Sequence, residues 1–162
     1  MKERVAFSKY SIVTTFVCVV VLVAVMFVNN PPLQVQLTLG GVMVLMLLSG
    51  LFWVPLWISA DKYAICIRRC LKTKVLPMQD VKLVKLSPPT MGTIRICGSG
   101  GFLGYWGWFR ERDLGKYFAY YGRSSDCFLV ELKDGRKYML GCKNAPSMVE
   151  YINSFIGQEK YS

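Results

Sequence analysis

The sequence predicts an α-helical transmembrane hairpin followed by a mainly-β cytosolic domain of the α+β class. Three observations predict it: two long apolar runs near the N-terminus, a series of short alternating segments after residue 60, and one amphipathic segment near the C-terminus. The 162-residue chain is 53% hydrophobic, and the excess over a soluble protein is concentrated near the N-terminus. We therefore expect a membrane anchor over residues 1–60 and a cytosolic domain over residues 61–162.

The two apolar runs are long enough to cross a bilayer as helices. They cover residues 11–28 and 37–58 and contain no charged side chain. A helix of roughly 20 residues spans a hydrocarbon core of about 30 Å. The alternative for the first run is a cleavable signal peptide, but no A-x-A-like cleavage site occurs before Asn29. Pro55 is expected in the last turn of the second helix, where a lost backbone hydrogen bond is tolerated best.

Basic residues on the flanks of these runs indicate their orientation. Lys2, Arg4 and Lys9 precede the first run and more basic residues follow the second, whereas the connection 29–36 carries no charge. Because lysine and arginine are retained on the cytoplasmic side, we expect a multi-pass protein with both termini in the cytoplasm.

Short segments with period-two alternation follow residue 60. The expected strands cover residues 63–68, 71–75, 81–86, 93–97, 116–121, 128–132 and 136–140. Asp134-Gly135 between the last two is typical of a type I′ hairpin. Residues 145–157 repeat apolar side chains with helical spacing, from Met148 to Ile156. Six or seven antiparallel strands and one helix favour a partly open barrel capped by that helix.

Residues 98–122, GSGGFLGYWGWFRERDLGKYFAYYG, combine glycines with aromatic residues. The spacing lacks the third glycine of a dinucleotide-binding loop, and no P-loop Gly-Lys-Ser/Thr is present. Glycines at every third position are expected to permit bulges or sharp turns. The aromatic residues are too many for a small core, so we expect some of them to contact the bilayer interface or a partner; packing beneath their own loop is the alternative. The candidate interaction surface comprises Phe102, Tyr105, Trp106, Trp108, Phe109 and Arg110.

The sequence resembles bacterial pleckstrin-homology-like domains attached to a membrane hairpin. The resemblance lies in the order of strands, the terminal helix and the run GGFLGYWGWFRERDLGKYFAYYG. The resemblance covers roughly residues 62–156. It implies a pleckstrin-homology (PH) fold, a bacterial inner-membrane location and a scaffold that hosts lipid-headgroup, peptide or protein binding. It implies no catalytic motif, and fold alone does not determine function.

Several chemistries are disfavoured by the composition. The chain contains no histidine, which removes Ser-His and Cys-His pairs and mixed zinc sites, so we expect no enzymatic activity, no metal and no cofactor. The six cysteines are expected to be reduced and mostly buried, because the domain is predicted to be cytosolic. Nucleic acid and a small-molecule substrate are not expected as partners either, because residues 98–122 carry three basic residues against two acidic ones.

The net charge of +10 is concentrated just after the second apolar run. Residues 61–85 hold seven lysines and arginines against two aspartates. Such a segment attracts the anionic inner leaflet, although it also serves as the topology signal of the preceding helix. The candidate lipid-contacting residues are Lys62, Arg68, Arg69, Lys72 and Lys74. We therefore expect a membrane-anchored module that presents its domain to a protein partner of unknown identity, and a second copy of the same chain is one candidate for that partner. The alternative is a sensor of the anionic lipid surface.

Overall fold

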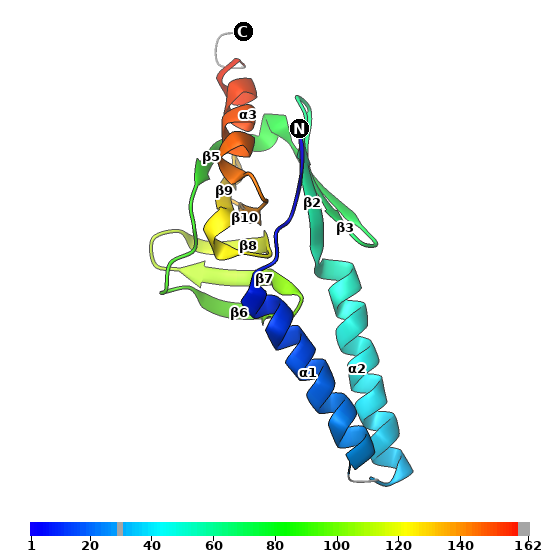
Figure 1. The fold of residues 1–162 in the computed structure, drawn as a ribbon. Helices are drawn as coiled ribbons and strands as arrows, with labels where there is room; N and C mark the ends of the chain where they lie inside the picture. The colour runs from blue at the N-terminus through cyan, green and yellow to red at the C-terminus, as the bar shows by residue number, and fades with distance from the viewer. Residues whose placement is uncertain (29–30, 159–162) are drawn as a thin grey trace.

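The computed structural model describes residues 1–28 and 31–158. Figure 1 shows two long helices side by side, which project from one end of a β-rich domain. A third helix lies at the far end of that domain, and the chain leaves the β-rich part into α1 and returns to it from α2 (Figure 1). The predicted fold class is confirmed: a helix pair at the N-terminus, a mainly-β domain with open sheets, and a C-terminal helix.

The helix pair consists of α1 (Lys9–Val28) and α2 (Leu33–Trp53). By length and composition, both are long and apolar enough to cross a membrane. The predicted end of the second helix at residue 58 was wrong. Val54 has an extended backbone (φ −66°, ψ 121°) and Pro55 begins a strand, because the residue before a proline disfavours the helical conformation.

The first sheet has four antiparallel strands in the order β1-β2-β3-β4. They are β1 (Lys2–Arg4), β2 (Pro55–Ala60), β3 (Ala64–Arg69) and β4 (Thr73–Pro77). Strand β1 precedes the first helix and was not predicted. It pairs Glu3 with Ile58, and the terminal ammonium of Met1 donates to the carbonyl of Ala60 at 2.7 Å. Residues on both sides of the helix pair therefore build the same sheet.

The second sheet has six strands in the order β5-β9-β10-β8-β7-β6. Their bounds are Val81–Leu86 for β5, Ile94–Gly101 for β6, Gly104–Glu111 for β7, Gly115–Tyr121 for β8, Cys127–Leu132 for β9 and Lys137–Gly141 for β10. Strands β8 and β10 run parallel, with Phe118 opposite Tyr138, so the expectation of a purely antiparallel arrangement was wrong. The connection from β8 through β9 places β10 beside β8 rather than at an edge.

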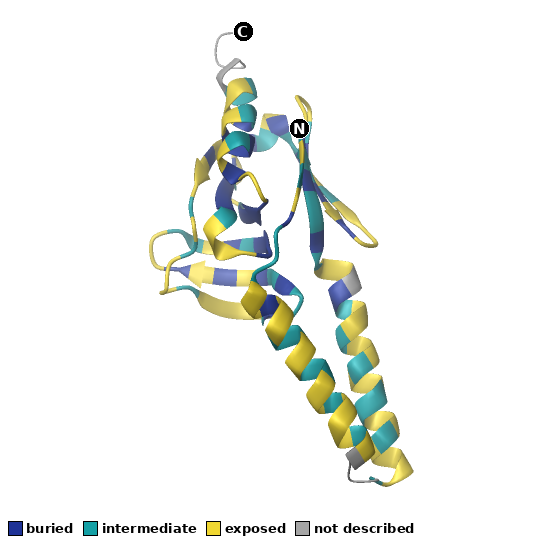
Figure 2. Cartoon of the chain, in the orientation of Figure 1, coloured by how far each residue is buried: buried dark blue, intermediate teal, exposed yellow. Residues whose placement is uncertain are grey.

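The main core lies between the two sheets and beneath α3 (Ala145–Gln158). Ile58 and Ile67 of the first sheet and Phe128 of the second are completely buried in it, as are Met148 and Ile152 of α3. This confirms the predicted amphipathic helix. Figure 2 shows the buried residues gathered in the strands and on one side of α3, whereas α1 and α2 are largely exposed.

The first part of the glycine-rich run, residues 98–111, belongs to the β6–β7 hairpin, where we expected the regularly spaced glycines to permit bulges or sharp turns. Its glycines face one another in pairs, Gly98 with Gly107 and Gly101 with Gly104, and all four have positive φ. A Cβ on Gly107 would lie 2.2 Å from the carbonyl oxygen of Cys97. The two glycine pairs therefore belong to a two-stranded ribbon whose tip is Phe102-Leu103, with close backbone approach at the Gly98–Gly107 pair.

The Asp134-Gly135 hairpin between β9 and β10 is confirmed, but its type I′ turn was wrong. Among the described non-glycine residues only Leu103 has positive φ, so Asp134 does not meet the requirement of that turn. The amide of Gly135 donates to the carbonyl of Leu132 at 3.0 Å, and Gly135 has φ 84°. This is a type I turn followed by a left-handed glycine, the usual form of a three-residue loop.

Candidate functional site

A cleft of about 470 Å³ opens between the two sheets beside the C-terminal end of α2. One wall comes from the β3–β4 hairpin, the other from β7, β8 and β10, and the last turn of α2 closes one side. Its lining consists of Phe52, Trp53, Arg69, Lys72, Thr73, Lys74, Trp108, Phe118, Tyr120 and Tyr138. We call it the basic–aromatic cleft. It brings together three of the five basic residues singled out from the sequence.

Arg69 is the most constrained cation of the cleft. It is the last residue of β3 and only 8% exposed, because β-strand alternation turns its side chain toward the second sheet. Its guanidinium carbon lies 5.3 Å from the ring centre of Trp53 and 5.6 Å from that of Tyr120. Its buried Nε has no hydrogen-bond partner, and Arg69 takes part in none of the ion pairs between described residues. A largely buried arginine without a carboxylate beside it is uncommon in proteins.

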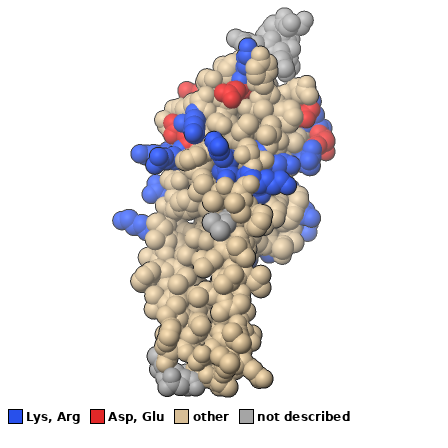
Figure 3. All heavy atoms as spheres, turned by 90° about the vertical axis from the view of Figure 1, so that its right-hand side faces the viewer, with Lys and Arg blue, Asp and Glu red and all other residues tan. Residues whose placement is uncertain are grey.

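Two lysines of the β3–β4 hairpin extend the positive charge outward from Arg69. Lys72 is exposed in the turn, whose backbone is closed by the amide of Arg69 donating to the carbonyl of Lys72 at 3.0 Å. Lys74 places its Nζ 6.0 Å from the ring centre of Tyr138. No aspartate or glutamate is among the described residues that line the cleft. Figure 3 shows lysine and arginine side chains in a band above the apolar helix pair.

Aromatic rings form the rest of the cleft wall. Trp108 is 39% exposed and makes an edge contact with Phe118, with ring centres 5.1 Å apart. Lys116, on the neighbouring strand, holds its Nζ 4.7 Å from the ring centre of Trp108. Burial raises the pKa of the Tyr120 phenol, and the nearby Arg69 works in the opposite direction. Tyr120 therefore stays neutral near pH 7 and offers a hydrogen-bonding hydroxyl rather than a negative charge.

The other two predicted lipid-contacting residues lie outside the cleft. Lys62 sits in the β2–β3 turn with its Nζ 4.8 Å from the ring centre of Tyr63. Arg68 is exposed and, as the neighbour of Arg69 in the strand, points to the opposite face of the sheet, beside Trp57. The predicted set is thus divided among the cleft, the β2–β3 turn and the opposite face of β3.

The predicted aromatic surface is also divided. Phe102 lines a gap between α1 and α2, Tyr105 stacks on Tyr121, and Trp106 stacks on Trp53 with ring centres 6.1 Å apart. Phe109 is only 4% exposed, so its place in an exposed surface was wrong. Among the six residues only Trp108 and Arg110 are exposed.

The tip of the β6–β7 hairpin is docked on the helix pair, next to the cleft. The hydroxyl of Ser11 donates to the carbonyl of Gly101 at 2.6 Å and accepts from the amide of Gly104 at 2.7 Å. The hydroxyl of Thr15 accepts from the amide of Leu103 at 2.9 Å. A Cβ on Gly50 would lie 2.2 Å from Leu103 Cδ1, so glycine lets α2 accept the tip. Docking of the hairpin on the helices therefore brings Trp106 of β7 against Trp53 of α2.

The comparisons with known proteins agree with this architecture. A family model described as bacterial PH domain matches residues 57–156. The chain belongs to the bacterial PH domain family. No curated protein and no solved structure matched the chain. PH domains are binding modules, so membership indicates a binding or scaffolding role. The match of this bacterial PH domain includes the whole of β3–β10 but begins within β2, after the helix pair and after Trp53.

Sequence reasoning missed the cleft residues contributed by distant elements: Trp53, Phe118, Tyr120 and Tyr138. The alternation in residues 116–121 did place Phe118 and Tyr120 on one face of a strand. Nothing local placed that face opposite Arg69, because the contact depends on how the two sheets pack.

Proposed function

We propose that this protein is a non-enzymatic, membrane-anchored PH module of the bacterial cytoplasmic membrane, whose basic–aromatic cleft binds the anionic headgroup of a lipid. In this proposal α1 and α2 cross the bilayer, and both termini and the β-rich domain lie in the cytoplasm. The ligand is a phosphate-bearing headgroup of the inner leaflet.

The distribution of charge supports the membrane topology. In the two stretches that could span a membrane, Lys9–Phe27 and Leu33–Gly50, only 6% of the residues are buried inside the protein, so their apolar side chains need another apolar environment. Basic residues flank the ends of the helices that meet the β-rich domain, and the connection 29–36 has none. Positive charge is retained on the cytoplasmic side.

The unpaired guanidinium of Arg69 is the observation that carries the headgroup proposal. Arginine is less strongly hydrated than lysine and binds phosphate through two parallel N–H donors, so it is suited to a partly desolvated anion site. Lys72 and Lys74 supply further charge without any competing carboxylate in the described lining. A phosphate in the cleft would receive donors that the described residues leave unused.

The position of the cleft, at the proposed surface of the bilayer, supports a membrane lipid as the source of that phosphate. Trp53 ends α2 and lines the cleft, so the site opens where the second helix leaves the bilayer. Tryptophan is enriched at this depth because its ring is amphipathic. A headgroup can reach the cleft from here while its acyl chains remain in the hydrocarbon layer.

Neighbouring arginines provide a matched test of the headgroup proposal. Full-length protein in nanodiscs is assayed by native mass spectrometry for retained phosphatidylglycerol against phosphatidylcholine with the same acyl chains. Arg69→Gln is expected to lower the retention of phosphatidylglycerol by about tenfold or more, because a hydrogen bond to a charged group contributes about 1.5–3 kcal/mol. Arg68→Gln removes the same charge one residue away, on the other face, and should change retention little. Equal losses of phosphatidylglycerol in both variants would show that only net charge matters and would contradict binding in the cleft.

A protein partner is the second candidate, and the free edge of β6 favours it. Among the described residues strand β6 pairs only with β7, and Ile94 and Ile96 on it are 66% and 51% exposed. An unpaired strand edge with apolar side chains can receive a strand from another chain. Disulfide or maleimide crosslinking in native membranes through the exposed Cys97 should then give a discrete complex, whereas the exposed Cys70 should not. Only monomer at Cys97 would argue against a partner on this edge.

A further inference from the structure

An apolar groove lies between α1 and the tip of the β6–β7 hairpin, on a different surface from the basic–aromatic cleft. Its volume is about 410 Å³. We propose that this groove holds an acyl chain of an inner-leaflet lipid. The inference rests on the proposed function in one respect, namely that α1 and α2 cross the membrane.

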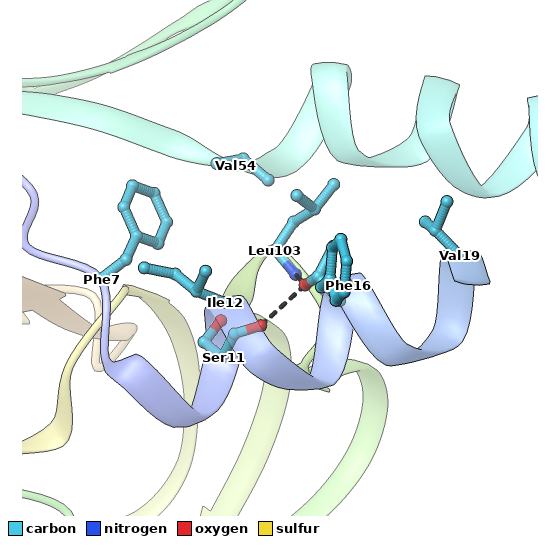
Figure 4. Close-up of a pocket in the computed structure, with 8 residues that line it drawn as sticks. Phe7, Ser11, Ile12, Phe16, Val19, Val54 and Leu103 are labelled. Atoms are coloured by element: carbon cyan, nitrogen blue, oxygen red, sulfur yellow. Dashed lines mark hydrogen bonds between the residues drawn. The ribbon is translucent and has the colours of Figure 1, made fainter. Parts of the chain in front are cut away.

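The walls of the groove come from three separate parts of the chain. Ile12, Phe16 and Val19 line it from one side of α1, and Phe7 lies just before that helix. Val54 follows the end of α2, and Leu103 comes from the hairpin tip. Figure 4 shows these side chains around the space between the two helices, with Leu103 between α1 and the chain that follows α2.

The polar atoms of the groove are already occupied. Ser11 uses its hydroxyl both as donor and as acceptor toward the hairpin backbone. Thr15 donates its hydroxyl to the carbonyl of Ser11 at 2.8 Å and accepts from the amide of Leu103. A buried water needs two to four polar partners, and the described lining presents almost no polar surface beyond these two engaged hydroxyls. The groove therefore suits a hydrocarbon occupant rather than water.

The hairpin tip creates the groove by holding the helices apart. Leu103 adopts a φ of 52°, which is uncommon for a residue with a side chain, and its Cδ1 lies against Gly50 of α2. Phe102 occupies the gap between the helices deeper along them, next to Val19 and Met46. Because this wedge is fixed by hydrogen bonds, the helices cannot close the space on their own.

The surroundings identify the occupant as an acyl chain. Ile12 and Phe16 are 60% and 68% exposed, so the groove is open sideways along α1 rather than toward the β-rich domain. These residues lie in the first turns of α1, beside the leaflet that the basic–aromatic cleft faces in the proposed topology. In that leaflet the molecules at this depth are lipid chains, and an empty space of this size would leave its walls without packing partners.

Photocrosslinking tests the groove directly. Full-length protein in nanodiscs is irradiated with phosphatidylglycerol that carries a diazirine in one acyl chain, and the modified peptides are mapped by mass spectrometry. The expected adducts lie on residues 12–19 and on the hairpin tip. Val19→Phe fills the groove and should abolish these adducts, whereas Val20→Phe, a lipid-exposed neighbour outside the lining, should keep them. A second pair, Ile12→Phe against Val13→Phe, repeats the comparison at the other end in case one variant folds poorly.

The outcomes separate this inference from the proposed function. Equal adducts in the filled and control variants, or adducts spread evenly around α1, would overturn the acyl-chain site. A crosslink that joins two protein chains at the groove would also overturn it, because a second copy would then be the occupant. Extraction of the protein from membranes by alkaline carbonate would instead contradict the membrane anchor. Loss of headgroup preference on Arg69→Gln is scored separately and does not depend on the groove.

Discussion

Ser11 is predicted to control the docking of the β6–β7 hairpin onto the helix pair. Its side chain is 1% exposed, and its hydroxyl is the partner of two backbone groups, the carbonyl of Gly101 and the amide of Gly104. Ser11→Ala would leave both groups buried and unpaired. At about 1–3 kcal/mol for each unsatisfied group, the variant should weaken docking by roughly 2–4 kcal/mol, after some relaxation.

Hydrogen exchange at the hairpin tip measures this docking. An opening equilibrium that shifts by about 2 kcal/mol should speed the exchange of the tip amides by about 30-fold where opening limits exchange. Thr38→Ala is the matched control, because its hydroxyl donates to the carbonyl of Gln34 within the same helix. Unchanged exchange at residues 101–104 in Ser11→Ala, or an equal change in Thr38→Ala, would refute the role assigned to the hydroxyl.

Two further predictions follow from the glycine pairs and the thiols. Gly107→Ala should lower the free energy of unfolding by about 3 kcal/mol or more, because the added Cβ would overlap the backbone of Cys97 and Gly107 has a positive φ. Gly92→Ala should be near neutral, because the nearest atom to its Cβ would lie at 3.9 Å. Thermal unfolding of the two variants checks this prediction. Burial raises the pKa of Cys142 to about 11, so this thiol stays protonated below that pH and should react with maleimide at pH 8 far more slowly than the exposed Cys97. Equal labelling rates in the folded protein would contradict the burial.

The local patterns of the sequence predicted most of the secondary structure. The two apolar runs predicted the helix pair, and alternation predicted β3, β4, β5, β8, β9, β10 and the first half of β6 as strands. The Asp134-Gly135 pair marked its hairpin, and the spacing from Met148 onward predicted α3. Each of these signals depends on neighbours within one element, so it can be read without knowing the tertiary structure.

The elements that sequence reasoning missed depend on distant contacts. Strand β1 is three residues long, and it forms only because Ile58 and its neighbours, beyond both helices, supply a partner edge. Strand β7 was not predicted, because its glycines interrupt the alternating pattern of a strand. Their role becomes clear only in the folded chain, where Gly107 lies opposite Gly98. The end of α2 was misplaced because apolar residues continue from the helix into β2, and composition alone does not mark that boundary.

The candidate site was predictable only in part for the same reason. Basic residues after the second helix were singled out together, but alternation in β3 sends Arg68 and Arg69 to opposite faces. The rings of Trp53 and Tyr120 that surround Arg69 belong to elements 16 or more residues away in the chain. Charge could therefore be located from the sequence, whereas its enclosure by aromatic rings could not.

The central claim, an anionic headgroup in the basic–aromatic cleft, is tested most directly by an experimental structure of the full chain in nanodiscs that contain phosphatidylglycerol. We predict density for a phosphate between the β3–β4 hairpin and Trp108, with one oxygen about 2.7–2.9 Å from a terminal guanidinium nitrogen of Arg69. A phosphate held at Lys62 or Arg68, with the cleft empty, would contradict the account.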